Sequence, residues 1–156
     1  MKAFFLAATL LVLPALAGAA TFTFIVAGLG GEPEYEQRFQ EQAAAIAEAA
    51  RKAASEQGQV VMLTGEQARR DSVRREFQEF ASKMKATDSA TVVLIGHGSY
   101  DGEEYRFNVP GADITGSDLG QLFEKLPAKQ QLIVNATSAS GATIEQWQRP
   151  DRVIIT

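Results

Sequence analysis

The order of apolar segments is the feature that most constrains the fold of this chain. Short runs rich in Val, Ile and Phe alternate with longer segments of helical character, and the runs cover 21–27, 59–63, 91–95, 131–134 and 152–156. Apolar runs of this length are typical of strands that are buried on both faces of a parallel sheet. Strands that alternate with helices are joined by β-α-β crossovers. The pattern therefore predicts an α/β fold, a three-layer α/β/α sandwich with a mostly parallel sheet.

Helices are predicted between these runs. The first helix, over 34–57, follows Pro33, stops at Gly58 and carries an apolar stripe made of Tyr35, Phe39, Ile46 and Ala53. In the second helix, Thr64 and Gln67 stand in capping-box register, and the apolar face consists of Val73, Phe77, Phe80 and Met84. We interpret its opposite face as a solvated surface, which carries Arg69, Arg70, Arg74, Arg75, Glu76 and Glu79.

The second half of the chain has shorter predicted elements. A polar loop over 100–104 leads into a strand-like piece over 105–109. Thr115 is expected to cap a helix that Pro127 ends, and a further short helix is expected over 144–147. The chain then stops on an apolar strand with no helix to cover it. We therefore expect the natural protein to continue beyond Thr156.

Composition restricts the chemistry that this fold can carry. The chain has 156 residues, enough for one domain with its own core. It has no Cys and one His, which excludes disulfides, a thiol nucleophile and a metal site built from several histidines. A formal net charge of −4 argues against a nucleic-acid-binding surface. We therefore expect no cofactor, no metal and no nucleic-acid partner.

The first 19 residues have the pattern of a secretory signal peptide. Lys2 is a positive n-region, residues 4–13 form an apolar h-region, and Ala17-Gly18-Ala19 is an A-x-A cleavage site. The apolar run is shorter than the roughly 20 residues that span a bilayer. We expect a leader over 1–19, a domain over 20–156, a periplasmic or extracellular location and no membrane contact after cleavage. The alternative is a leader retained as an N-terminal anchor.

The loops after two apolar runs are the places where chemistry is expected, because open parallel sheets bind ligands beyond the carboxyl ends of their strands. His97 follows the run 91–95, and a Ser-rich turn with Ser138 and Ser140 follows the run 131–134. One crossover separates the two loops, so they are expected to be neighbours. His97 can then act as general base for a serine nucleophile. The alternatives are a histidine bonded to backbone and hydroxyls that cap free N–H groups.

Three other motifs are weaker. The turn Gly28–Gly31 departs from the dinucleotide-binding fingerprint, and the acidic residues beside it would repel a phosphate. The acids in 101–104 do not have the spacing of an EF-hand and are interpreted as solvated turn residues. Asn135-Ala136-Thr137 matches the glycosylation sequon, but a glycan there would crowd a strand end.

The segments TVVLIGHGSYDG over 91–102, ITGSDL over 114–119 and QLIVNATSASG over 131–141 together resemble the caspase-fold cysteine peptidases. The likeness is strongest to the legumain-like branch and its bacterial relatives. In that family one strand ends in His-Gly, and the next core strand ends in a Cys two residues before Ser-Gly. The resemblance covers about 21–156 and includes Ala27-Gly28 with Gly31 and Tyr35. It implies a caspase–hemoglobinase-like sandwich with a sixth strand after Thr156.

The resemblance also implies roles for three residues. His97 matches the catalytic histidine, Gly98 matches the glycine whose N–H helps to form the oxyanion hole, and Ser138 matches the nucleophilic cysteine. The serine is the main departure, because a hydroxyl is a far poorer nucleophile than a thiolate. Legumain also has an Asn after its first strand, and this chain has Gly30 near that place.

Two functions follow from these residues. The first is an exported, legumain-type peptidase that uses Ser138 with His97 as base and acts on a peptide or protein substrate. The second is a catalytically inactive module of the same fold that binds a peptide or a partner protein. A doubly wound hydrolase of another family is a third alternative, against which the missing G-x-S-x-G elbow counts.

Overall fold

The computed structural model of the protein describes residues 18–156. The predicted leader over 1–19 therefore lies outside the described residues, apart from Gly18 and Ala19, which are both exposed. No helix in the described part of the chain is long and apolar enough to cross a membrane.

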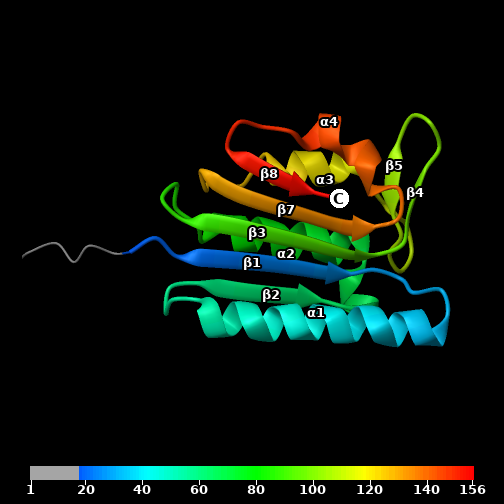
Figure 1. The fold of residues 1–156 in the computed structure, drawn as a ribbon, viewed down its shortest axis with the longest axis horizontal. Coiled ribbons are helices and arrows are strands. Elements are labelled where there is room, and N and C mark those ends of the chain that lie inside the picture. Colours follow the sequence, from blue (N-terminus) through cyan, green and yellow to red (C-terminus); the bar gives the residue numbers. More distant parts are fainter. Residues whose placement is uncertain (1–17) are drawn as a thin grey trace, which may run out of the picture.

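A five-stranded sheet forms the centre of the molecule (Figure 1). Its strands lie in the order β2-β1-β3-β7-β8, and every neighbouring pair is parallel. The strands are β1 Thr21–Ala27, β2 Gln59–Leu63, β3 Ser89–Gly96, β7 Gln130–Thr137 and β8 Arg152–Ile155. Each predicted apolar run thus forms a strand. Strand β7 extends beyond its apolar run to Thr137, because its polar end continues to pair with β3.

Helices cover both faces of the sheet, as predicted. Helix α1 (Pro33–Ala53) lies on one face, where Ala43 and Ala47 pack with Ile25 and Val93. Helices α2 (Arg70–Ser82) and α3 (Gly116–Phe123) lie on the other face and enclose the larger core (Figure 1). The aromatic rings of that core include those of Phe22, Phe24, Phe77, Phe80, Phe123 and Trp147. The α/β/α sandwich is therefore confirmed.

The first helix differs from its prediction in two ways. It ends at Ala53, earlier than predicted, because Ala54 adopts an extended conformation with a ψ of 142°. Its fully buried residues are Ala43 and Ala47, whereas Tyr35 and Ile46 of the predicted stripe are exposed. Small alanines let the helix approach the sheet closely, so the larger side chains lie at the margins of the contact.

The predicted capping box at Thr64 does not form. Gly65 has a positive φ of 51° and begins a short 3-10 helix, η1 (Gly65–Ala68), so α2 starts only at Arg70. The apolar face of α2 is nevertheless buried as predicted. At α3 the expected cap is present, because Thr115 Oγ1 accepts the N–H of Asp118 at 3.0 Å.

A smaller antiparallel sheet lies at the carboxyl end of the large sheet (Figure 1). It consists of β4 (Gly98–Tyr100), β5 (Tyr105–Phe107) and β6 (Ile114–Thr115). It is joined to the loop after β3 by a hydrogen bond from the N–H of Asn108 to the carbonyl of His97 at 3.0 Å. The small sheet therefore fixes the backbone on which His97 sits.

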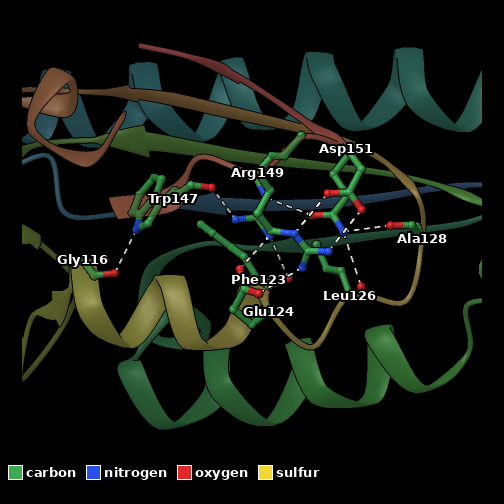
Figure 2. Close-up of polar contacts among 10 residues, drawn as sticks. Gly116, Phe123, Glu124, Leu126, Ala128, Trp147, Arg149 and Asp151 are labelled. Atoms are coloured by element: carbon green, nitrogen blue, oxygen red, sulfur yellow. Dashed lines mark hydrogen bonds and ion pairs between the residues drawn. The ribbon is translucent and has the colours of Figure 1, made fainter. Parts of the chain in front are cut away.

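A buried arginine, Arg152, ties the last strand to the rest of the molecule. Figure 2 labels three of its partners, Phe123, Glu124 and Trp147. The Arg152 guanidinium has no exposed surface and donates to the Gln131 side chain at 2.9 Å, the Trp147 carbonyl at 2.6 Å and the Phe123 carbonyl at 3.2 Å. It also pairs with Glu124 at 3.3 Å. The Trp147 indole in turn donates to the Gly116 carbonyl at 2.9 Å, which fastens the short helix α4 (Ile144–Trp147) to α3. The Arg152 guanidinium lies at the amino ends of β7 and β8, whereas the Trp147 ring also packs edge-on against Tyr105, which supports the loops discussed next.

Candidate active site

The parallel register brings the two predicted loops together. Gly96, the last residue of β3, is the register partner of Thr137, the last residue of β7. His97 and Ser138 are the next residues in each chain segment, so they begin adjacent turns at the same end of the sheet.

The backbone of Gly98 lies against the backbone of Ser138. A Cβ atom at Gly98 would be 2.6 Å from the Ser138 carbonyl oxygen and 2.8 Å from the Tyr105 hydroxyl. Any side chain at this position would push the two turns apart. The glycine is therefore required by a close approach of two chain segments, since its own φ lies outside the left-handed region.

His97 is oriented by a backbone carbonyl. Its Nε2 lies 3.2 Å from the Gly30 oxygen in the turn after β1. A carbonyl oxygen can only accept a hydrogen bond, so Nε2 carries a proton, and in the neutral ring the free lone pair is on Nδ1. The Tyr35 and Phe39 rings pack edge-on against the imidazole, with centroids at 5.7 and 5.3 Å. His97 is therefore half-buried and held through Nε2, which leaves Nδ1 for another partner.

The Gly30 turn is itself held by α1. The N–H of Gly30 donates to Glu36 Oε2 at 2.8 Å, and the other carboxylate oxygen of Glu36 accepts from Gln40 at 3.0 Å. A Cβ atom on Gly30 would collide with the backbone of Glu36. The glycine turn thus positions the Gly30 carbonyl to accept a hydrogen bond from His97, a role that the sequence did not indicate.

The Ser138 turn has an unusual backbone. Ala139 has a φ of 58°, the only positive φ of a non-glycine residue in the described part of the chain. Such a conformation costs of order 1 kcal/mol or more and persists only where surrounding structure holds it. Ser138 is exposed, and its hydroxyl forms no hydrogen bond to another residue of 18–156. Ser140 begins the 3-10 helix η2 (Ser140–Thr143), and its carbonyl accepts the Thr143 hydroxyl at 2.7 Å.

A buried network of polar side chains supports the Ser138 turn. Thr137 Oγ1 lies 2.5 Å from the Tyr105 hydroxyl and donates to Asn135 Oδ1 at 2.8 Å. Asn135 is fully buried and reaches Thr143 in η2 at 3.4 Å. Burial raises the pKa of Tyr105, although its hydrogen bonds to Thr137 and Asn135 oppose the shift. Because Asn135 is buried in this network, it is not available as a glycosylation site in the folded protein.

An apolar groove lies beside the site. It has a volume of about 430 Å³ and is lined by Gln42, Ala45, Ile46, Val93, Ile95, Val134 and Ala136. Ile95 is the penultimate residue of β3, and His97, two residues further on, packs against Tyr35 and Phe39 of α1, on the face that the groove occupies. The groove therefore leads along the α1 face of the sheet toward the two loops.

The acids in the loop after β4 have a local structural role. Asp101 accepts the N–H groups of Glu104 at 2.8 Å and Glu103 at 3.0 Å, and it pairs with Arg106. These donors, the Glu104 N–H first, hold the pKa of Asp101 well below its usual range. Within residues 18–156 no cluster of three or more acidic or histidine side chains could hold a metal ion.

Comparisons with known proteins bear on the fold. No family model matches the chain, and no curated protein matches it. Among solved structures, the protein GSU0716 from Geobacter sulfurreducens is similar, with a TM-score of 0.54 and 15% identity over 87% of this chain. The likeness establishes the fold alone. The chain spans 57% of the length of that protein. The resemblance to legumain-like peptidases and the roles of His97, Gly98 and Ser138 stay predictions.

Proposed function

We propose that this chain is an exported peptidase-type hydrolase of the caspase fold, with His97 as base and Ser138 as a slow nucleophile. The observation that carries the proposal is the hydrogen bond from His97 Nε2 to the Gly30 carbonyl. His97 follows the end of β3, and Ser138 follows the end of the neighbouring strand β7. An imidazole fixed in this tautomer presents Nδ1 as a proton acceptor. A serine hydroxyl needs such a base to attack at neutral pH.

The reaction is acyl transfer from a peptide bond to the serine. Ser138 Oγ attacks the carbonyl carbon, and its proton passes to Nδ1 of His97. The N–H groups of Gly98 and Ser138 donate to the resulting oxyanion, as preorganised donors of this kind contribute about 3–4 kcal/mol. The imidazolium then protonates the leaving amine as the C–N bond breaks. Water, deprotonated by His97, hydrolyses the ester to release the acid.

The groove would bind the residues of the substrate peptide next to the bond that is cleaved. Its lining is almost entirely aliphatic, with Gln42 as the exception, so it suits an apolar side chain of an extended peptide. We expect attack by the serine to limit the rate for two reasons. A hydroxyl ionises far less readily than a thiol, and no carboxylate in the described structure is hydrogen-bonded to His97 to make it a stronger base. We therefore expect slow turnover of activated esters and peptides.

A second candidate function is non-catalytic peptide binding by the same groove. It is favoured by one observation, that no hydrogen bond joins His97 to Ser138 within residues 18–156. In this case His97 and Tyr35 would form one wall of a recognition site, and the Ala139 turn would be a contact surface.

A fluorophosphonate probe separates the two functions. The purified exported protein is treated with the probe and digested, and the labelled peptide is identified by mass spectrometry. We expect the label on Ser138, its loss in Ser138→Ala, and a loss of at least about 100-fold in labelling rate in His97→Ala. Ser140→Ala is the matched control and keeps the label. Absence of labelling, together with saturable binding of apolar peptides that Ile46→Asp abolishes, would support the second candidate.

A further inference from the structure

The amino-terminal end of the domain is built around one buried carboxylate. Asp88, which directly precedes β3, is 5% exposed. Its Oδ1 accepts the N–H of Ala20 at 3.0 Å, and its Oδ2 accepts the N–H of Lys85 at 2.7 Å. No ion pair within residues 18–156 involves this carboxylate. Both hydrogen-bond donors are neutral amides, so the carboxylate has no cation of the described residues in direct contact, although the two amide donors, that of Ala20 first, and after them the Lys85 charge lower its pKa.

The burial of the chain changes abruptly at Ala20. Gly18 and Ala19 are exposed, whereas Ala20 is 3% exposed and belongs to the larger core cluster. The Ala20 carbonyl also accepts the N–H of Ser89 at 2.9 Å, so the residue is fixed through both its nitrogen and its oxygen. The fold therefore holds the chain from the nitrogen of Ala20 onward. The A-x-A pattern of Ala17-Gly18-Ala19 independently predicts a new terminus at that same nitrogen.

We propose that cleavage between Ala19 and Ala20 creates an amino terminus for which Asp88 is the built receptor. Hydrolysis of this peptide bond leaves a carboxylate on Ala19 and an amine on Ala20, and the amine is protonated at neutral pH. The new ammonium occupies the position of the N–H that now lies 3.0 Å from Oδ1 and adds a positive charge and further donors. The present hydrogen bond has one ionised partner, the carboxylate, whereas the ammonium makes both partners ionised and adds a direct charge–charge attraction. Processing thus places a positive charge in direct contact with Asp88, whose donors in the precursor are neutral amides.

This inference is independent of the proposed hydrolysis, since Ala20 and Asp88 lie at the amino end of the sheet. It assigns two roles to one residue. In the precursor Asp88 fixes the start of β1 by accepting a backbone N–H, and in the processed protein it stabilises the same strand through an ion pair. The removal of the leader is therefore expected to increase the stability of the fold, in addition to releasing the protein.

The first test is the position of the terminus and the state of its amine. The full chain is exported from a bacterial host, and the intact mass of the product should match a chain that begins at Ala20. The folded product is then treated with an amine-reactive reagent at pH 7, and labelling at Ala20 is measured by peptide mapping. We expect labelling at least about tenfold slower than in the urea-unfolded chain, since each unit by which an amine's pKa rises lowers its reactive fraction about tenfold.

Burial and ion pairing are separated by the pH dependence of that labelling rate. Burial alone lowers the pKa of an amine, whereas a neighbouring carboxylate raises it. An α-amino pKa above about 8 supports the ion pair, and a value below the ordinary range of about 7.7–8.0 overturns it. Asp88→Asn should remove the protection, and Asp71→Asn, an exposed acid on α2, should leave it unchanged. A product that begins at another residue, or an Ala20 amine that reacts as fast in the folded as in the unfolded chain, also overturns the proposal. The wild-type measurements decide the question even if Asp88→Asn fails to fold.

Discussion

Replacing Arg152 by Met should destabilise the fold without touching the candidate active site. The substitution keeps an apolar stem but removes every donor of the guanidinium. It leaves two buried acceptors without a donor, the Gln131 side-chain oxygen and the Trp147 carbonyl. The Phe123 carbonyl also loses Arg152 but keeps the N–H of Leu126 at 3.2 Å. A buried acceptor without a donor costs about 1–3 kcal/mol.

The size of the effect follows from two opposing contributions. Burial lowers the pKa of Arg152, which shows that its charge is held at a cost that the substitution relieves. The Glu124 side chain is 57% exposed, so losing its partner does not strand a buried charge. The stranded acceptors dominate, and we expect a loss of about 3 kcal/mol in the free energy of unfolding. For a domain of this size that corresponds to a fall of roughly 10 °C in Tm.

Urea unfolding followed by fluorescence measures this loss directly, because Trp147 is the single tryptophan and is fully buried next to Arg152. The matched control is Arg149→Met. Arg149 pairs with the same Glu124 and with Asp151, but its side chain is 32% exposed, so its loss should cost less than about 1 kcal/mol. A loss below about 1 kcal/mol for Arg152→Met, or equal losses for the two variants, would refute the reasoning.

Three further predictions concern the two ends of the sheet. Gly98→Ala should lower the free energy of unfolding by about 1–3 kcal/mol in urea titrations and abolish probe labelling, whereas Gly141→Ala, where a Cβ meets nothing within 4 Å, should do neither. Ser138→Cys should react with thiol-directed peptide electrophiles far faster than wild type reacts with fluorophosphonate, and adding His97→Ala should remove this gain; a rate unaffected by His97→Ala would mark an ordinary exposed thiol. Two N–H donors, that of Ala20 first, lower the pKa of Asp88 below 3.8 in the folded state, so its stabilisation is present above that pH and is lost as pH falls through the folded pKa. Urea titrations from pH 7 to 2 should therefore show the stability gap between wild type and Asp88→Asn closing below about pH 4, and a constant gap contradicts this.

The strands were predictable because each is a continuous apolar run between turn residues. Strand β1 and strand β2 were predicted with their observed bounds. The residues of β1 after Thr21 are buried, whereas in the edge strand β2 only Leu63 is fully buried. The end of β7 was not predicted, since Asn135 and Thr137 have no apolar signal. Their strand conformation comes from pairing with β3 and from the network beneath the turn, which are both long-range contacts.

The candidate site was predictable in its location but not in its contacts. The order of strands and glycine loops sufficed to place His97 and Ser138 at neighbouring strand ends. The contact of His97 with Gly30 could not be predicted, because a backbone carbonyl is present at every residue and has no sequence signature. The contact between Gly98 and the Ser138 carbonyl could not be predicted for the same reason, because it arises only from the parallel register of β3 and β7.

The position of β1 has a consequence for the order in which the protein folds. This strand is the first to be synthesised, yet it lies inside the sheet and pairs on both sides with strands that come later. Its anchoring hydrogen bond from Ala20 to Asp88 spans 68 positions of the sequence. Non-local parallel pairing of this kind forms slowly. The larger core also includes Phe123 and Trp147, so β1 cannot be fully enclosed until the chain has been made through Trp147.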